Sequence, residues 1–90
     1  MELYELLEKV NSQESFFDFL VALEKDKRDE DEKEKQSPSS PYHRGHNGWE
    51  NNSIANFLES MIAGGRDSDF PEVPSWKTFA VILYLGKIYE

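Results

Sequence analysis

The hydrophobic residues of this chain recur at spacings of three and four residues in four separate stretches. This spacing is typical of amphipathic helices, because it places apolar side chains on one side of a helix. The most regular stripe consists of Ile54, Phe57, Leu58, Met61 and Ile62. The four stretches predict helices at 3–10, 12–26, 52–63 and 75–89.

The last stretch, 75–89, is apolar on nearly every side of a helical wheel. We therefore expect it to be the buried centre, with the other helices packed around it. The run from Phe79 to Leu85 would also suit a buried strand. Helix is favoured because Ser75 is a good N-cap and no other segment predicts a partner strand. The predicted fold class is all-α, a small bundle of about four helices round a buried C-terminal helix.

The segments between the stripes are polar and carry helix-breaking residues. The charged run 24–35 predicts a solvated extension of the second helix, and 36–48 predicts a long disordered loop rich in Pro, Ser and Gly. Gly64 and Gly65 are expected to end the third helix. Neither half of the chain is large enough to bury a core alone, so 1–90 is expected to form one domain.

The acidic and basic residues give a formal net charge of −8. Such a surface repels nucleic acids and anionic membranes, and it favours basic proteins or cations as partners or simply keeps the protein in solution. The chain contains no cysteine and no apolar run of membrane-spanning length, and its acidic start does not resemble a signal peptide. These features predict a cytoplasmic protein.

No motif in the chain predicts catalysis, a metal or a cofactor. His43 and His46 have the spacing H-x-x-H, but they fall in the predicted loop without a third ligand at a recognised spacing. The Gly64-Gly65 pair follows a helix, whereas phosphate-binding glycine loops precede one. No Ser-His-Asp or Cys-His arrangement stands out. We therefore expect a protein that is not an enzyme.

Three short motifs carry a resemblance to a known family. They are W-E-N at Trp49 to Asn51, F-L-E at Phe57 to Glu59, and K-I-Y-E at Lys87 to Glu90. With them the chain resembles an uncharacterised family of small acidic bacterial proteins of cyanobacterial type, whose members have no assigned activity. Immunity partners of secreted toxins are similar in size and charge.

These observations leave three functional hypotheses open. The first is a noncatalytic, immunity-type or regulatory protein-interaction module that docks on a basic partner through Trp49, Glu50, Tyr89 and Glu90. The aromatic residues of that set, Trp49 and Tyr89, would equally suit packing at the edge of the core. The second is a small-molecule-binding protein or enzyme with a pocket between the third and fourth helices. The third is a homo-oligomer, expected if three short helices cannot cover the fourth.

Overall fold

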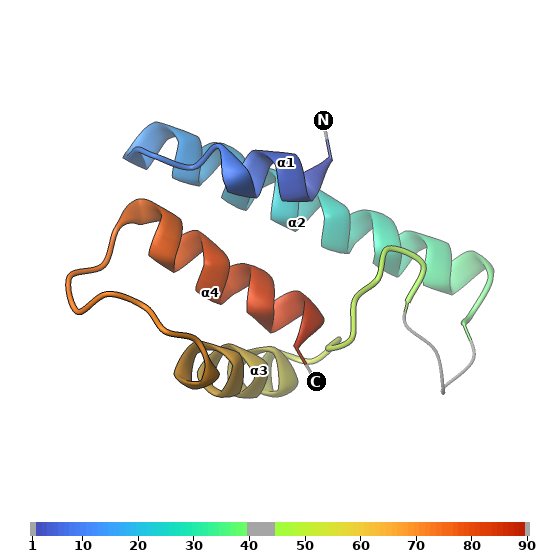
Figure 1. Cartoon of the computed structure of the whole chain (residues 1–90). Coiled ribbons are helices and arrows are strands. Elements are labelled where there is room, and N and C mark those ends of the chain that lie inside the picture. The colour runs from blue at the N-terminus through green and yellow to red at the C-terminus, as the bar shows by residue number, and fades with distance from the viewer. Residues whose placement is uncertain (1, 40–44, 90) are drawn as a thin grey trace.

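The computed structural model describes residues 2–39 and 45–89, and within them it contains four helices and no strand (Figure 1). The helices are α1 (Leu3–Glu8), α2 (Gln13–Gln36), α3 (Ile54–Asp67) and α4 (Trp76–Ile88). The predicted all-α fold class is thereby confirmed. None of these helices has the length and the apolar run needed to cross a membrane.

Side-chain caps fix where three of the helices begin. Ser12, Ser53 and Ser75 are the N-caps of α2, α3 and α4, and each hydroxyl accepts a hydrogen bond from a backbone N–H three residues later. Such a cap contributes about 1 kcal/mol to helix stability. The cap at Ser75 is the one expected from the sequence.

Helix α2 continues to Gln36, well beyond the predicted end at residue 26. Ion pairs one turn apart, such as Arg28 with Glu24 and Lys33 with Asp29, support the extension. The extension is also not fully solvated, because Glu30 is completely buried on its inner side. Tertiary contact therefore holds a stretch that helix propensity alone would leave frayed.

The expected stop at Gly64 and Gly65 is wrong, since α3 runs through both residues to Asp67. Gly64 allows α4 to pack closely against α3. A Cβ at Gly64 would lie 3.1 Å from side-chain atoms of Leu85 and Tyr89 on α4. On α4, a Cβ at Gly86 would lie 2.6 Å from the Phe57 ring of α3. Small residues on both helices thus let α3 and α4 approach closely.

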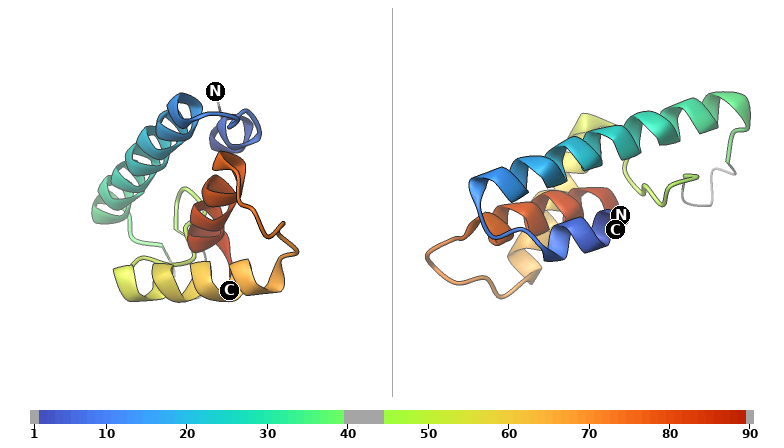
Figure 2. Two further views of the ribbon diagram at one scale, coloured as in Figure 1. Left: turned by 90° about the vertical axis from the view of Figure 1, so that its left-hand side faces the viewer. Right: turned by 90° about the horizontal axis from the view of Figure 1, so that it is seen from above.

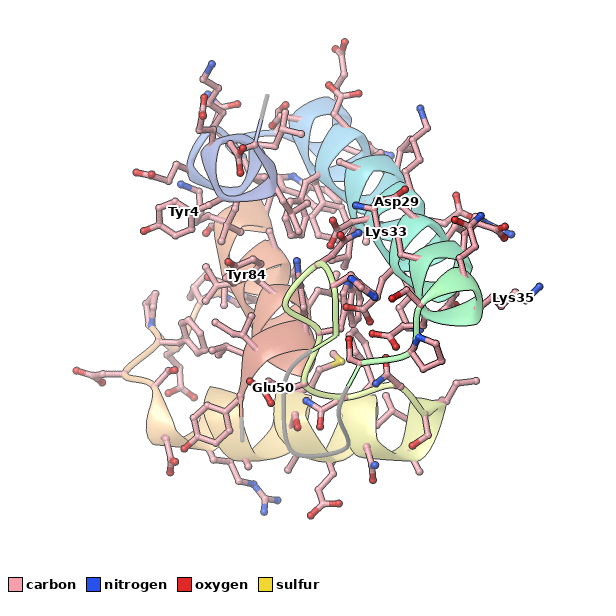
Figure 3. All side chains as sticks on the ribbon, turned by 90° about the vertical axis from the view of Figure 1, so that its right-hand side faces the viewer. Tyr4, Asp29, Lys33, Lys35, Glu50 and Tyr84 are labelled. Atoms are coloured by element: carbon pink, nitrogen blue, oxygen red, sulfur yellow. The ribbon has the colours of Figure 1, made fainter. Side chains whose placement is uncertain are left out.

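Helix α4 is the only described helix that packs against each of the other three. Helices α2 and α3 lie on different sides of it and do not contact each other (Figure 2). Tyr84 of α4 also meets Tyr4 of α1, with ring centroids 6.1 Å apart (Figure 3). The buried apolar core comprises Leu7, Val10, Phe16, Phe19, Leu23, Trp49 and Ala80.

The cover of α4 is incomplete at its N-terminal end. Trp76 and Phe79 remain 38% and 44% exposed. The regular stripe of α3 is also only partly covered. Phe57 and Met61 contact α4, whereas Ile54 is 80% exposed. The three helices around α4 therefore leave part of the apolar surface exposed.

Candidate functional site

The segment 45–51 crosses from α2 to the C-terminal end of α4, and we call it the Trp49 segment. Its turn is closed by a hydrogen bond from the Gly48 N–H to the Gly45 carbonyl, 2.9 Å, and Gly48 has a positive φ of 82°. The Glu50 N–H donates to the Lys87 carbonyl of α4 at 3.0 Å. Of the loop expected at 36–48, residues 45–48 take part in these contacts, while residues 40–44 lie outside the described residues.

Glu30 of α2 anchors this segment. Its Oε1 accepts the backbone N–H groups of Asn47 and Trp49, each at 3.1 Å, and its side chain is fully buried. Gly45 is required beside it, because a Cβ there would lie 2.2 Å from the same oxygen. Sequence reasoning missed this residue, since nothing in the charged run distinguishes Glu30 from the acids that face solvent.

Asp26 of α2 binds the Trp49 ring and α4 with a single oxygen. Its Oδ2 accepts the indole N–H of Trp49 at 2.9 Å and an N–H of the Lys87 ammonium at 2.6 Å. Lys87 is only 7% exposed and Trp49 only 4%. A charge-assisted hydrogen bond of this kind is about twice as strong as a neutral one. The network joins α2, the Trp49 segment and α4, and it fixes the orientation of the indole.

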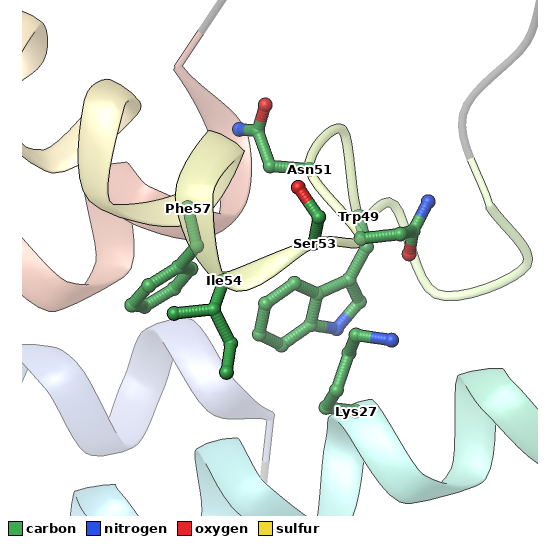
Figure 4. Close-up of a pocket in the computed structure, with 7 residues that line it drawn as sticks. Lys27, Trp49, Asn51, Ser53, Ile54 and Phe57 are labelled. Atoms are coloured by element: carbon green, nitrogen blue, oxygen red, sulfur yellow. The ribbon is translucent and has the colours of Figure 1, made fainter.

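The indole of Trp49 forms a wall shared by two adjoining hollows. The first, about 200 Å³, is lined by Lys27, the segment from Asn51 to Ile54, and Phe57 (Figure 4). The second, about 440 Å³, extends along α2 past Leu20 and Leu23. Lys27 and Trp49 line both. We call the combined depression the trough. It lies between α2 and α3, which do not touch.

The floor of the trough is apolar and its α2 rim is charged. In the first hollow the Trp49 and Phe57 rings are stacked with centroids 6.1 Å apart. On the rim, Arg28 pairs with Glu24 and Lys27 pairs with Asp31. The Lys27 ammonium also lies 5.7 Å from the centroid of the Trp49 ring.

Of the four residues predicted to bind a partner, the structure describes Trp49, Glu50 and Tyr89 and places them in different surroundings. Trp49 lines the trough, and Glu50 is half-buried beside the end of α4. Tyr89 lines a different hollow of about 170 Å³ between α3 and the end of α4, together with Asn51, Asn56, Glu59, Ser60 and Ala63. Glu90 lies outside the described residues. The leucines and lysine of the α2 wall were not among the predicted site residues.

The hollow at Tyr89 lies beside α3 and the end of α4. Its polar lining comes from α3, from Tyr89 directly after α4, and from Asn51, whose amide donates to the Gly86 and Tyr89 carbonyls. A hydrogen bond to the Asp67 carboxylate raises the pKa of the Tyr89 hydroxyl above 10.0. The described residues contain no group of three or more side chains able to hold a metal ion.

The carboxylates of Glu34 and Asp29 also have shifted pKa values, and both accept hydrogen bonds from residues that follow α2. The Ser39 hydroxyl and N–H donate to Glu34 and lower its pKa below 4.5. The Asn47 amide donates to Asp29, which together with Lys33 lowers the pKa of Asp29 below 3.8. His46 donates its backbone N–H to Glu34. The same hydrogen bonds hold Ser39, His46 and Asn47 against α2.

Residues 12–90 match a family of unknown function, DUF7660, and the chain belongs to this family. A comparison with curated proteins and a comparison with solved structures find no match to this chain. The resemblance to an uncharacterised family is thereby confirmed as far as membership of a family without a known function.

Proposed function

Starting from a family without a known function, we propose that this protein is a noncatalytic interaction module that binds a basic partner protein in the trough. An immunity-type inhibitor or a regulator of a basic protein is a role of this kind. The observation that carries the proposal is the pair of hollows joined at Lys27 and Trp49, with an apolar floor and charged rim.

The occupant that fits this site is an amphipathic helix with basic residues beside its apolar stripe. Its apolar side chains would pack on Leu20, Trp49 and Phe57, and its bases would meet Glu24 and Asp31 on the rim. Helix-in-groove binding uses anchors spaced three and four residues apart. The net charge of −8 supports the choice, because it attracts a basic partner from a distance and disfavours an acidic one.

A helical peptide built only of leucine and lysine provides a defined probe. The chain has two tryptophans, and only Trp49 lines the trough. In a nitrogen-15 NMR titration the Trp49 indole signal is therefore expected to shift saturably, while the Trp76 indole signal stays in place. Glu24→Lys with Asp31→Lys should weaken binding about tenfold, because two rim contacts of ~0.7 kcal/mol each are lost.

The control is Glu5→Lys with Glu8→Lys, which changes the net charge equally on exposed positions of α1. This pair should keep the affinity within about twofold, since surface charges separated by more than about 10 Å are largely screened at 0.1 M salt. If both pairs weaken binding alike, the peptide responds to net charge alone and the trough is not its site. A Trp49 signal that never moves would equally contradict the proposal.

The hollow at Tyr89 supports a second candidate, a small-molecule-binding protein or enzyme. Its polar lining is the supporting observation. The corresponding test is a thermal-shift screen with small polar metabolites on the native chain and on Asn56→Leu. A ligand that raises the melting temperature of the native chain but not of the variant would favour this candidate over the trough.

A further inference from the structure

Resting on the second candidate above, we infer that the hollow at Tyr89 binds a small molecule that carries a guanidinium group. This site is separate from the trough and does not depend on peptide binding there. The hollow has a volume of about 170 Å³ and is lined by Asn51, Asn56, Glu59, Ser60, Ala63 and Tyr89. A cavity of about 150 Å³ accepts a benzene molecule, so this hollow has room for a planar group of similar size.

Helix α3 supplies most of the lining from one of its faces. Asn56, Glu59, Ser60 and Ala63 are spaced three, four and seven residues from the first of them, which places them in line along the helix. The C-terminal end of α4 lies over α3 and brings Tyr89 to the hollow (Figure 1). This end is the negative end of the helix dipole and favours a cation.

Ser60 is the residue that points most directly to a ligand. It is only 7% exposed, yet within residues 2–39 and 45–89 its hydroxyl forms no hydrogen bond. The Ser68 hydroxyl at the end of α3, by contrast, donates to the Gly64 carbonyl at 2.7 Å. Buried polar groups in proteins are nearly always hydrogen-bonded. Because Ser60 lines the hollow, a partner for its hydroxyl has to enter there.

The groups around Ser60 mainly offer hydrogen-bond acceptors. The Asn51 amide nitrogen uses its two hydrogens on the Gly86 and Tyr89 carbonyls, at 3.0 and 3.1 Å. The Asn51 Oδ1 is therefore the amide atom left for a ligand. The Tyr89 hydroxyl donates to the Asp67 carboxylate, which leaves its oxygen as an acceptor. A ligand that donates several hydrogen bonds fits this lining.

Charge restricts the ligand to a cation. Among the described residues that line the hollow, Glu59 is the only charged one, and none is basic. A guanidinium carries five N–H donors and no acceptor, whereas an ammonium carries three. The lining offers five acceptor oxygens, one each from Asn51, Ser60 and Tyr89 and two from Glu59. A carboxylate also pairs with a guanidinium through two parallel hydrogen bonds, so a guanidinium fits better than an amine.

An NMR titration of the full chain with methylguanidinium tests the inference. The Ser60 backbone signal and the Asn56 side-chain amide signals should shift saturably, with a dissociation constant of about 1 to 10 mM, because so small a ligand makes few contacts. The Trp49 indole signal, which reports on the trough, should stay in place.

Two further small molecules serve as controls for the charge of the probe. Methylurea has nearly the same planar shape without the charge, and it should bind at least about tenfold more weakly, since charge-assisted hydrogen bonds are about twice as strong as neutral ones. Acetate, an anion, should leave the signals in place. Equal shifts with methylurea or acetate would overturn the assignment of a guanidinium.

Glu59→Gln keeps the shape of the side chain and removes its charge, so it should weaken methylguanidinium binding about tenfold. Ser60→Ala should weaken it about threefold or more, because one hydrogen bond to a charged donor is lost. The matched control is Glu72→Gln, an exposed acid on the connection between α3 and α4, which should stay within about twofold. Full affinity in both hollow variants, or equal weakening by the control, would refute the site.

A blocked tripeptide with arginine between two glycines separates a small molecule from a protein side chain. It should bind no more tightly than methylguanidinium, because a hollow of about 170 Å³ accommodates the guanidinium but not the flanking peptide groups. Much tighter binding of the tripeptide would overturn the choice of a small molecule and indicate an arginine of a partner protein.

Failure of this inference can be told apart from failure of either proposed function. If methylguanidinium does not bind, but another metabolite raises the melting temperature of the native chain and not of Asn56→Leu, the ligand class is wrong and the small-molecule site remains. A shift of the Trp49 indole signal with the helical peptide would support the trough whatever the outcome at Ser60.

Discussion

Asp26→Asn is expected to lower the free energy of unfolding by about 3 kcal/mol. The substitution removes the charge that Lys87 and the Trp49 indole share at 2.6 and 2.9 Å. Loss of a counter-ion costs a buried charge about 3 to 5 kcal/mol, and a hydrogen bond to a charged group is worth about 1.5 to 3 kcal/mol. We take the low end because the Asp26 side chain is 24% exposed and solvent screens the pair.

Urea unfolding, followed by circular dichroism and tryptophan fluorescence, measures this change. A loss of 3 kcal/mol corresponds to a fall in melting temperature of about 12 to 24 °C for a domain of this size. Adding Lys87→Met to Asp26→Asn should recover at least about 1 kcal/mol, because an apolar side chain leaves no buried charge without a counter-ion. Comparing Asp26→Asn with the double variant separates the contribution of the buried Lys87 charge from that of the hydrogen bond to the indole.

The matched control is Asp18→Asn on the exposed side of α2, which should stay within about 0.5 kcal/mol of the native chain. If Asp26→Asn is equally silent, the network does not hold the Trp49 segment to α4. If Lys87→Met brings no recovery, the loss comes from the indole contact, and the argument from a buried ammonium is incorrect.

Two further predictions concern packing and pH. Gly86→Ala should destabilise the fold by about 1 to 3 kcal/mol, because its Cβ would lie 2.6 Å from the Phe57 ring. Gly65→Ala, whose Cβ has 3.9 Å of space, should stabilise it by about 0.5 to 1 kcal/mol in urea unfolding, and a loss there would contradict a continuous α3. The lowered pKa of Glu34 predicts stability that is present above pH 4.5 and lost as pH falls through the folded pKa. Carbon-13 NMR should therefore place its pKa below 4.5, and Glu34→Gln should reduce the fall in melting temperature on acidification; an ordinary pKa would contradict the bond to Ser39.

The helices and their starts could be read from the sequence because these features are local. Apolar spacing and a serine cap involve residues within one or two turns of each other, as at Ser75 and Thr78. The end of α3 could not be read in this way. The Gly64-Gly65 pair is a strong local stop signal, but its lack of side chains lets α4 pack closely, and that contact outweighs propensity.

The trough was even less accessible from sequence. Of its residues only Trp49 was among the candidates, because an aromatic residue after a loop stands out. Nothing local distinguishes Asp26 and Glu30 from the other acids of their run, although these two position the indole. The separation of Trp49 from Tyr89 into different hollows likewise depends on how α3 crosses α4.

By itself, the sequence determined the four helices found in residues 2–39 and 45–89, the strongly apolar character of the last one, and the negative net charge. Tertiary structure alone decided which acids are buried, which glycines lie at the contact between α3 and α4, and which part of the α3 stripe is left exposed. The reason is that helix formation depends on neighbours within a turn or two, whereas burial depends on partners such as Asp26 and Lys87, 61 residues apart.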